Sequence, residues 1–403
     1  MPAHGFRITL PDSPGLPGSV EELGKLKLAP SPLRPPCTAE ERIFKWRGVN
    51  TPPNLVIDSG VLRHLADMAS RASLRPSTQK GYGSGLRKFM IFCDTFSIPE
   101  KDRLPASLAV LNSFALWAAA DPDPSDLAFA DGTPFEPVSV ETVGHYLSAV
   151  RAWHLAQGWP APLTEEQMDV IQYNLRGLKQ IQAGKRKRPP RSPVTVHMLG
   201  CLKRTLKLDD PFEACLWAVA TCAFWGLMRF GEVTVKSRAA FSGQEHLKRK
   251  DAVFGRDING KDYVRLDLPR AKTAKPGEVQ QVFLVRQGEL CPIDALENLA
   301  RVVPAAGDDP LFSWRDRNGE IRPIVRDTAL SYLNSVFTAW GWGNAFGHSF
   351  RIGGASFFLG QKVDSETVRL LGRWRSIAYE TYVRAFEQIA SQHLSGLATR
   401  YGF

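Results

Sequence analysis

The sequence lacks any uninterrupted apolar run of about 18 residues, the length that a membrane-spanning helix requires. Its first residues, MPAHGFRITLPDSPGLPGS, also lack the basic and then apolar layout of a secretory signal. The six cysteines form no CxxC pair, which argues against both a zinc site and a disulfide scaffold. We therefore expect a protein that neither crosses a membrane nor is secreted, with its cysteines present as buried thiols.

Acidic residues are too few to balance the basic ones. The 403-residue chain has 51 Lys and Arg against 41 Asp and Glu, which gives a formal net charge of +10. Such an excess favours a polyanionic partner, either nucleic acid or an acidic membrane surface. The length suggests two or three domains, and 43% hydrophobic residues suffice for sizeable cores.

Composition divides the first half of the chain into three parts. Residues 1–55 are rich in proline and are predicted to form a largely irregular tail. Residues 56–183 place apolar residues at the i, i+3, i+4 spacing of helices, which predicts an all-α bundle. The segment GKRKRPPRSP, residues 184–193, has helix-breaking prolines and no acid, and is predicted to be a basic linker.

The cations of this linker are expected to contact the phosphates of a nucleic-acid backbone or to act as a nuclear-import signal. They are Lys185, Arg186, Lys187, Arg188 and Arg191. A linker that is merely solvated remains the alternative.

Residues 194–403 are predicted to form a second domain that is mainly helical. Within it, KDYVRLDLP and EVQQVFLV alternate apolar and polar residues as strands do, and the turn-prone RAKTAKPG joins them. Helical patterns precede and follow this hairpin. We thus predict a multidomain fold, in which an all-α bundle is followed by a mainly α domain with a small antiparallel β-sheet (α+β).

The second domain also carries residue types that suit phosphoryl transfer. They are Arg229 in GLMRFGEV, Lys272 or Lys275 in RAKTAKPG, His348 and Arg351 in HSFR, Trp374 in LGRW, and Tyr379 and Tyr382 in YETYVR. A tyrosine can form a covalent link to phosphate, and arginines can neutralise the phosphate oxygens bidentately. A lysine or histidine can protonate the leaving oxygen, so this chemistry needs no metal. Each residue alone has an ordinary structural explanation, and only the set in this order indicates a function.

In this order the residues closely resemble the tyrosine recombinase (phage-integrase-type) family, and its eukaryotic mobile-element members in particular. GLMRFGEV is similar to the first-arginine motif of the family, and HSFRIGGAS is similar to its H-x-x-R box. RAKTAK is similar to the segment that carries the hairpin lysine, and this likeness favours Lys272 over Lys275. LGRWRSIAYETYVR resembles the final box with the nucleophilic tyrosine. The resemblance implies a SAM-like core-binding domain over residues 56–183 and a catalytic domain of the DNA breaking-rejoining fold over residues 194–403.

The resemblance implies a site-specific recombinase that cuts and rejoins DNA strands for integration or excision. Arg229 and Arg351 would hold the scissile phosphate, supported by His348 and by the indole of Trp374. Glu232, one turn after Arg229, is expected to hold a catalytic group in place rather than to take part itself.

The same likeness implies that Tyr382 attacks the phosphate to form a 3′-phosphotyrosyl intermediate while Lys272 protonates the departing oxygen. Tyr382 follows Trp374 by eight residues, one fewer than the commonest spacing in the family. For this reason Tyr379 remains the alternative nucleophile.

The expected partner is double-stranded DNA, bound by a homo-tetramer on paired sites, with no cofactor, metal, membrane or small-molecule substrate. The expected location is the nucleus in a eukaryotic host and otherwise the cytoplasm or nucleoid. Two alternatives remain open: DNA relaxation like that of a type IB topoisomerase, and a catalytically silent DNA-binding protein derived from a mobile element.

Overall fold

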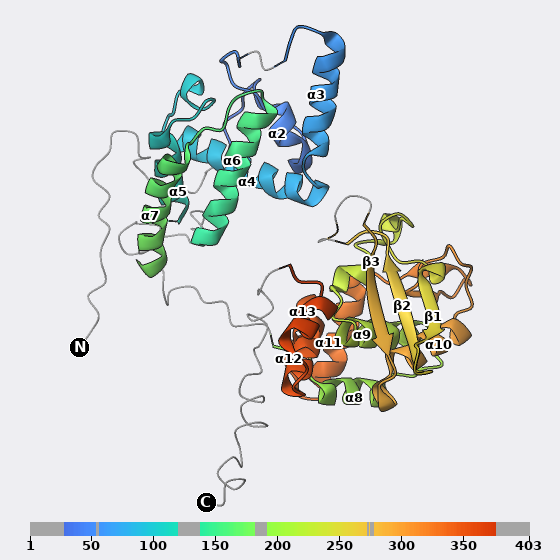
Figure 1. Ribbon diagram of the computed structural model, residues 1–403. Coiled ribbons are helices and arrows are strands. Elements are labelled where there is room, and N and C mark those ends of the chain that lie inside the picture. The colour runs from blue at the N-terminus through green and yellow to red at the C-terminus, as the bar shows by residue number, and fades with distance from the viewer. Residues whose placement is uncertain are drawn as a thin grey trace, which may run out of the picture. The chain divides into compact units, whose positions relative to one another are not determined.

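The computed structural model describes residues 28–53, 56–119, 138–181, 192–271, 274 and 278–375. These residues form two compact units, one before residue 182 and one after residue 191 (Figure 1). Among the described helices, none combines the length and apolar character needed to cross a membrane.

The first unit is helical. Its longer helices are α3 (Gly60–Ala72), α4 (Pro76–Thr95), α5 (Leu108–Ala119), α6 (Val140–Ala156) and α7 (Glu165–Ile181). Phe89, Phe114 and Trp153 are fully buried at its centre, with the rings of Phe89 and Phe114 meeting edge to face at 5.2 Å. The apolar stripes of α4, α5, α6 and α7 therefore form one core, whereas α3 buries none of its residues.

Residues 28–53 have little regular secondary structure but pack onto the first unit. They contain a 3-10 turn, η1 (Ala39–Glu41), and a short helix, α2 (Arg42–Lys45), and they bury Ile43, Phe44 and Trp46 in the core of the first unit. The indole of Trp153 donates a hydrogen bond to the carbonyl of Trp46 at 2.8 Å. Proline restricts the backbone but does not prevent neighbouring apolar side chains from being buried.

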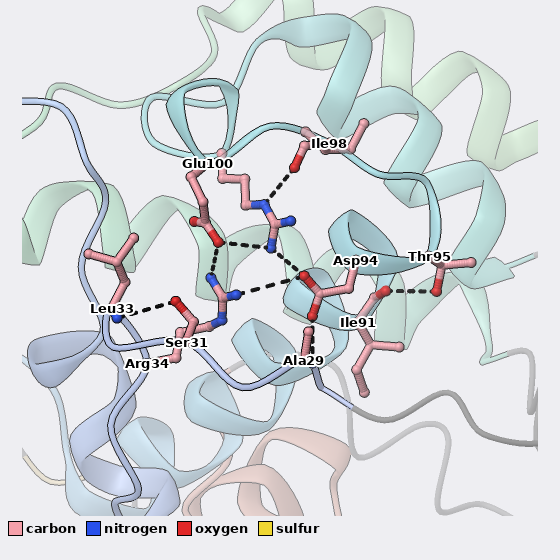
Figure 2. Close-up of polar contacts among 10 residues, drawn as sticks. Ala29, Ser31, Leu33, Arg34, Ile91, Asp94, Thr95, Ile98 and Glu100 are labelled. Atoms are coloured by element: carbon pink, nitrogen blue, oxygen red, sulfur yellow. Dashed lines mark hydrogen bonds and ion pairs between the residues drawn. The ribbon is translucent and has the colours of Figure 1, made fainter. Parts of the chain in front are cut away.

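A buried ion-pair network anchors this segment to the end of α4 (Figure 2). Arg34, whose side chain is 2% exposed, binds Glu100 at 2.6 Å and lies 3.8 Å from Asp94. Arg103 binds the same Asp94 oxygen at 2.6 Å, and the backbone N–H of Ala29 donates to the other oxygen of Asp94 at 2.9 Å. Two guanidinium groups that are almost fully buried thus pair with two carboxylates, of which Asp94 is 12% and Glu100 29% exposed.

The second unit combines helices with antiparallel strands. Its helices are α8 (Val196–Thr205), α9 (Pro211–Trp225), α10 (Pro292–Val302), α11 (Arg326–Ala339), α12 (Gly347–Gly360) and α13 (Ser365–Leu371). Its strands are β1 (Ala252–Arg256), β2 (Asp262–Leu268) and β3 (Gln280–Val285), in the order β1-β2-β3, and the hairpin β4 (Ser313–Arg315) and β5 (Ile321–Pro323). Short 3-10 turns complete the described elements: η2 (Glu100–Asp102) in the first unit, and η3 (Phe230–Glu232), η4 (Arg238–Ala240), η5 (Arg249–Asp251) and η6 (Gly288–Leu290) in the second.

These elements confirm the predicted fold class, an all-α bundle followed by a mainly α unit with a small antiparallel sheet. The predicted hairpin is β2 and β3, which pair with Val264 opposite Leu284. The sequence did not indicate β1 or the β4–β5 hairpin, because these strands are short and only partly buried.

Helix α9 is the buried centre of the second unit, with every residue from Ala214 to Trp225 inside the core. Helix α12 crosses it at backbone contact. A Cβ atom at Gly353 would lie 1.9 Å from the carbonyl oxygen of Val194, and one at Gly354 would lie 2.1 Å from that of Phe224. Glycine is therefore required at both positions, and this close approach sets the start of α12 beside the loop that follows α9.

Candidate active site

Three segments far apart in the sequence meet in the second unit. They are the loop after α9, which carries Arg229 and η3; the first two turns of α12, which carry His348 and Arg351; and the residues that end α13, with Trp374. Leu227 in the first segment and Arg373 in the third have φ values of 46° and 57°, a left-handed conformation that side-chain-bearing residues rarely adopt. Both segments are thus sharply turned where they meet.

Glu232 joins two arginines. Its carboxylate accepts hydrogen bonds from the backbone N–H of Arg229 at 2.9 Å and from the Nη1 of Arg229 at 3.0 Å. The same group accepts a bond from the Nη2 of Arg373 at 2.6 Å. Because the Glu232 side chain is only 8% exposed, these charge-assisted bonds form largely out of water, where they are strong.

Arg373 is a site residue that the sequence patterns did not indicate. Its side chain is 7% exposed, and its Nε and Nη1 atoms are buried without a hydrogen-bond partner in the described part of the chain. Burial lowers the pKa of Arg373, and the nearby charge of Arg229 acts in the same direction, whereas Glu232 opposes both. In the sequence, the position of Arg373 between the glycine and the tryptophan of LGRW could have drawn attention to it. No periodicity or spacing indicates its partner Glu232, which is 141 residues away.

Arg351 lies in the interior, with 1% of its surface exposed. Its guanidinium donates from Nη1 to the carbonyl of Leu227 and from Nη2 to the carbonyl of Gly372. It therefore ties α12 to the turns that follow α9 and α13. The resemblance implies that this group holds a phosphate; in the described structure it binds backbone carbonyls of the fold.

Trp374 covers Arg351. The Cζ of Arg351 lies 4.3 Å from the centre of the indole ring, a cation–π contact in a desolvated place. A Cβ at Gly372 would lie 1.7 Å from this ring, so only glycine fits beneath it. The carbonyl of Trp374 accepts a further bond from Nη1 of Arg369 at 2.9 Å. Trp374 is thus fixed both by its ring and by its backbone.

His348 lies in the first turn of α12 and is half-buried. It is three residues before Arg351, so both side chains belong to the same side of the helix. The hydroxyl of Ser349, a residue to which the sequence assigns no role, accepts a bond at 2.9 Å from the backbone N–H of Phe346, the residue that precedes the helix. The start of α12, with its favourable environment for anions, is thereby well defined.

The other predicted residues lie outside the described part of the chain. They are Lys272, Lys275, Tyr379, Tyr382 and the five linker cations Lys185, Arg186, Lys187, Arg188 and Arg191. The strands that flank Lys272 are described and paired, from Leu268 opposite Gln280 onward. No group of three potential metal-ligating side chains occurs among the described residues.

The cluster carries a net positive charge. Arg229, Arg351 and Arg373 contribute three positive charges and Glu232 one negative charge, a balance of 3 − 1 = +2 among these four side chains. Arg229 is the most accessible arginine of this group, with 20% of its side chain exposed. Such a cluster can bind a phosphate and offset the charge that develops on it during transfer.

Comparison with known proteins gives distant matches only. A scan against protein-family models finds no match, and a search of curated proteins finds none either. Among solved structures, the chain is similar to the XerH site-specific recombinase bound to the palindromic difH substrate, with 12% identity, 86% of each chain covered and a TM-score of 0.48.

Two further structures extend this comparison. The chain is similar to the Tn1549 transposon integrase in complex with transposon right end DNA, with 12% identity, 83% of this chain and 98% of that chain covered and a TM-score of 0.44. It is also similar to the XerA recombinase, with 15% identity, 82% and 97% covered and a TM-score of 0.35. These are recombinases and an integrase, the class that the motifs resemble, but at such identities and TM-scores the likeness by itself assigns no function.

Proposed function

We propose that this protein is a site-specific DNA recombinase that breaks and rejoins DNA strands through a covalent phosphotyrosyl intermediate. The observation that carries the proposal is the gathering of three arginines: Arg229 and Arg373 share the carboxylate of Glu232, and Arg351 binds the carbonyls of Leu227 and Gly372 in the turns that lead to them. Arg229 and Glu232 lie more than a hundred positions before Arg351 and Arg373 in the chain. A protein gathers so many cations in a buried place chiefly to meet an anion, since their burial is otherwise unfavourable.

In the proposed reaction the phenolic oxygen of Tyr382 attacks the scissile phosphorus as its O–H bond breaks and the proton passes to solvent water. The new O–P bond forms as the bond to the 5′-oxygen of the next nucleotide breaks, and Lys272 gives that oxygen a proton. A 5′-hydroxyl of a second strand then attacks the phosphotyrosyl link, which rejoins the DNA and restores the tyrosine. The phosphodiester energy is thereby kept without any cofactor.

The described residues would divide the remaining work. Arg229, the most exposed arginine of the cluster, would contact a nonbridging phosphate oxygen, with His348 donating a hydrogen bond beside it. Arg351 would act mainly by holding Trp374 and the two turns in place. We include in the proposal a tetramer on paired sites, integration or excision as the outcome, and linker cations on the DNA backbone.

A selection for covalent complexes from randomised DNA tests this function and identifies the target sequence at the same time. The full-length protein is incubated with nicked duplexes whose central sequence is randomised, so that release of a short fragment traps any phosphotyrosyl link. After denaturation, protein-linked DNA is isolated and sequenced. We expect recovery of one related set of sequences by the wild type and the Tyr379→Phe variant, and none by Tyr382→Phe.

Other outcomes separate the alternatives. Adducts that vanish in Tyr379→Phe but persist in Tyr382→Phe would move the nucleophile. Adducts with DNA of any sequence, together with relaxation of supercoiled plasmid, would indicate a topoisomerase. DNA that is bound with salt sensitivity but never linked would show a silent DNA-binding protein and overturn the proposed chemistry.

A further inference from the structure

We propose that Arg373 acts electrostatically through Glu232, keeping the Arg229–Glu232 pair cationic so that it can accept a phosphate. This inference rests on the proposed function and assigns a role to Arg373, a residue inside LGRW to which the motif comparison gives none. Arg229 and Glu232 alone form a neutral pair, whose two bonds at 2.9 Å and 3.0 Å engage the carboxylate fully with one partner. The third bond, from Arg373 at 2.6 Å, brings the group to a charge of 2 − 1 = +1.

Arg373 cannot take the place of Arg229 on the substrate. Its side chain is 7% exposed, against 20% for Arg229, and its Nε and Nη1 have no accessible surface of any size. Its charge reaches the phosphate only across the shared carboxylate. At these short distances in a poorly solvated place the interaction is hardly screened.

Stability does not explain the presence of Arg373. A buried guanidinium with two nitrogens that have no hydrogen-bond partner among the described residues is unfavourable. An apolar side chain of similar length would avoid the cost of burying the charge, and Glu232 would keep both bonds from Arg229. Arg373 therefore stabilises the fold less than an uncharged residue would, which points to a role for its charge.

If Arg373 acts through its charge, the direction of the change in rate can be predicted for a single and a double variant. Arg373→Met leaves Arg229 neutralised by Glu232, and we expect at least a tenfold loss of adduct-forming rate with an unchanged or raised melting temperature. Adding Glu232→Gln to Arg373→Met restores a charge of +1, and we expect most of the lost rate to return. Arg373→Lys keeps the charge and is expected to stay within about threefold of the wild type.

A second readout keeps this inference separate from the proposed function. Orthovanadate, a phosphate analogue that accepts five oxygen ligands, is titrated into the DNA-free full-length protein and binding is followed by the rise in melting temperature. We expect the Arg373→Met variant to bind vanadate more weakly than both the wild type and the double variant. Arg322→Met, which removes an arginine paired with Asp316 on the β4–β5 hairpin, is the control and should match the wild type.

These outcomes distinguish an electrostatic role of Arg373 from a purely structural one. A double variant no better than Arg373→Met in both assays would overturn the inference, because it would show that Arg373 acts only by holding Glu232 in position. Wild-type protein that binds no vanadate would overturn it as well. If no DNA adduct forms but the vanadate order holds, the recombinase proposal fails while the role of Arg373 stands.

Discussion

Replacing Arg351 with methionine tests whether this buried arginine stabilises the fold or is instead available to bind a substrate. The substitution keeps the apolar stem and removes the guanidinium, so the carbonyls of Leu227 and Gly372 each lose a donor. An unpartnered buried carbonyl costs about 1–3 kcal/mol, and the lost cation–π contact with Trp374 adds up to about 2 kcal/mol. Relief from burying a charge offsets part of this. We expect the second unit to lose about 3 kcal/mol.

Hydrogen exchange in the full-length protein can measure this loss in the second unit separately from the first. Amides near the middle of α9 and α12 exchange only when this unit opens, so their rates report its free energy of opening. A loss of about 3 kcal/mol corresponds to roughly 100-fold faster exchange. Peptides from α4 and α6 in the first unit should keep their wild-type rates.

Arg229→Met provides the matched control. Arg229 is more exposed, and its side chain bonds Glu232, which would keep the backbone N–H of residue 229 and the Nη2 of Arg373 as donors. We expect less than about 1 kcal/mol of destabilisation, or under about fivefold faster exchange. If Arg351→Met also stayed within about fivefold, its guanidinium would not be the partner of the two carbonyls, and its structural role would be refuted.

Two further predictions concern the cores of the two units. Gly354→Ala places a methyl group 2.1 Å from the carbonyl oxygen of Phe224 and should destabilise the second unit by about 2–4 kcal/mol in urea denaturation. Gly200→Ala is the control, because no atom would lie closer than 3.9 Å to its methyl group, and it should be neutral or stabilising. Equal effects of the two substitutions would contradict the close helix contact. His154 is fully buried between the N–H of Ala106 and the carbonyl of Val150, and burial lowers its pKa to about 4. The unfolded chain protonates this imidazole near pH 6.5, so the free energy of unfolding of the first unit should fall by up to about 3 kcal/mol between about pH 6.5 and about pH 4. A His154→Gln variant whose stability falls as steeply with pH would disprove the assignment.

Much of the fold could be predicted because apolar periodicity is a local signal. The patterns around residues 60–72, 140–156 and 292–302 match α3, α6 and α10, and the alternation in KDYVRLDLP matches β2. The burial of residues 28–46 could not be predicted, since it depends on partners such as Asp94 and Glu100, far along the chain. Proline content alone describes the backbone of such a segment and not what its side chains contact.

The candidate site shows the same limit at the level of single residues. Motif order selects Arg229 and Arg351 as equivalent phosphate ligands, yet one is partly exposed on a carboxylate and the other is enclosed between two carbonyls and an indole ring. Arg373, which no motif selects, shares the carboxylate instead. Two left-handed turns, at Leu227 and Arg373, adjoin this cluster, and spacing along the sequence does not reveal them.

The position of Arg351 gives it an indirect influence on the proposed nucleophile. One guanidinium binds the carbonyl of Leu227, two residues before Arg229, and the carbonyl of Gly372, two residues before Trp374. The turn that carries the proposed phosphate ligand and the turn from which the chain continues to Tyr379 and Tyr382 are therefore fixed to each other. A nucleophile must lie in line with the bond it breaks, and small displacements reduce the rate steeply. Arg351 can thus be essential for strand cleavage through this connection alone, without contacting the phosphate.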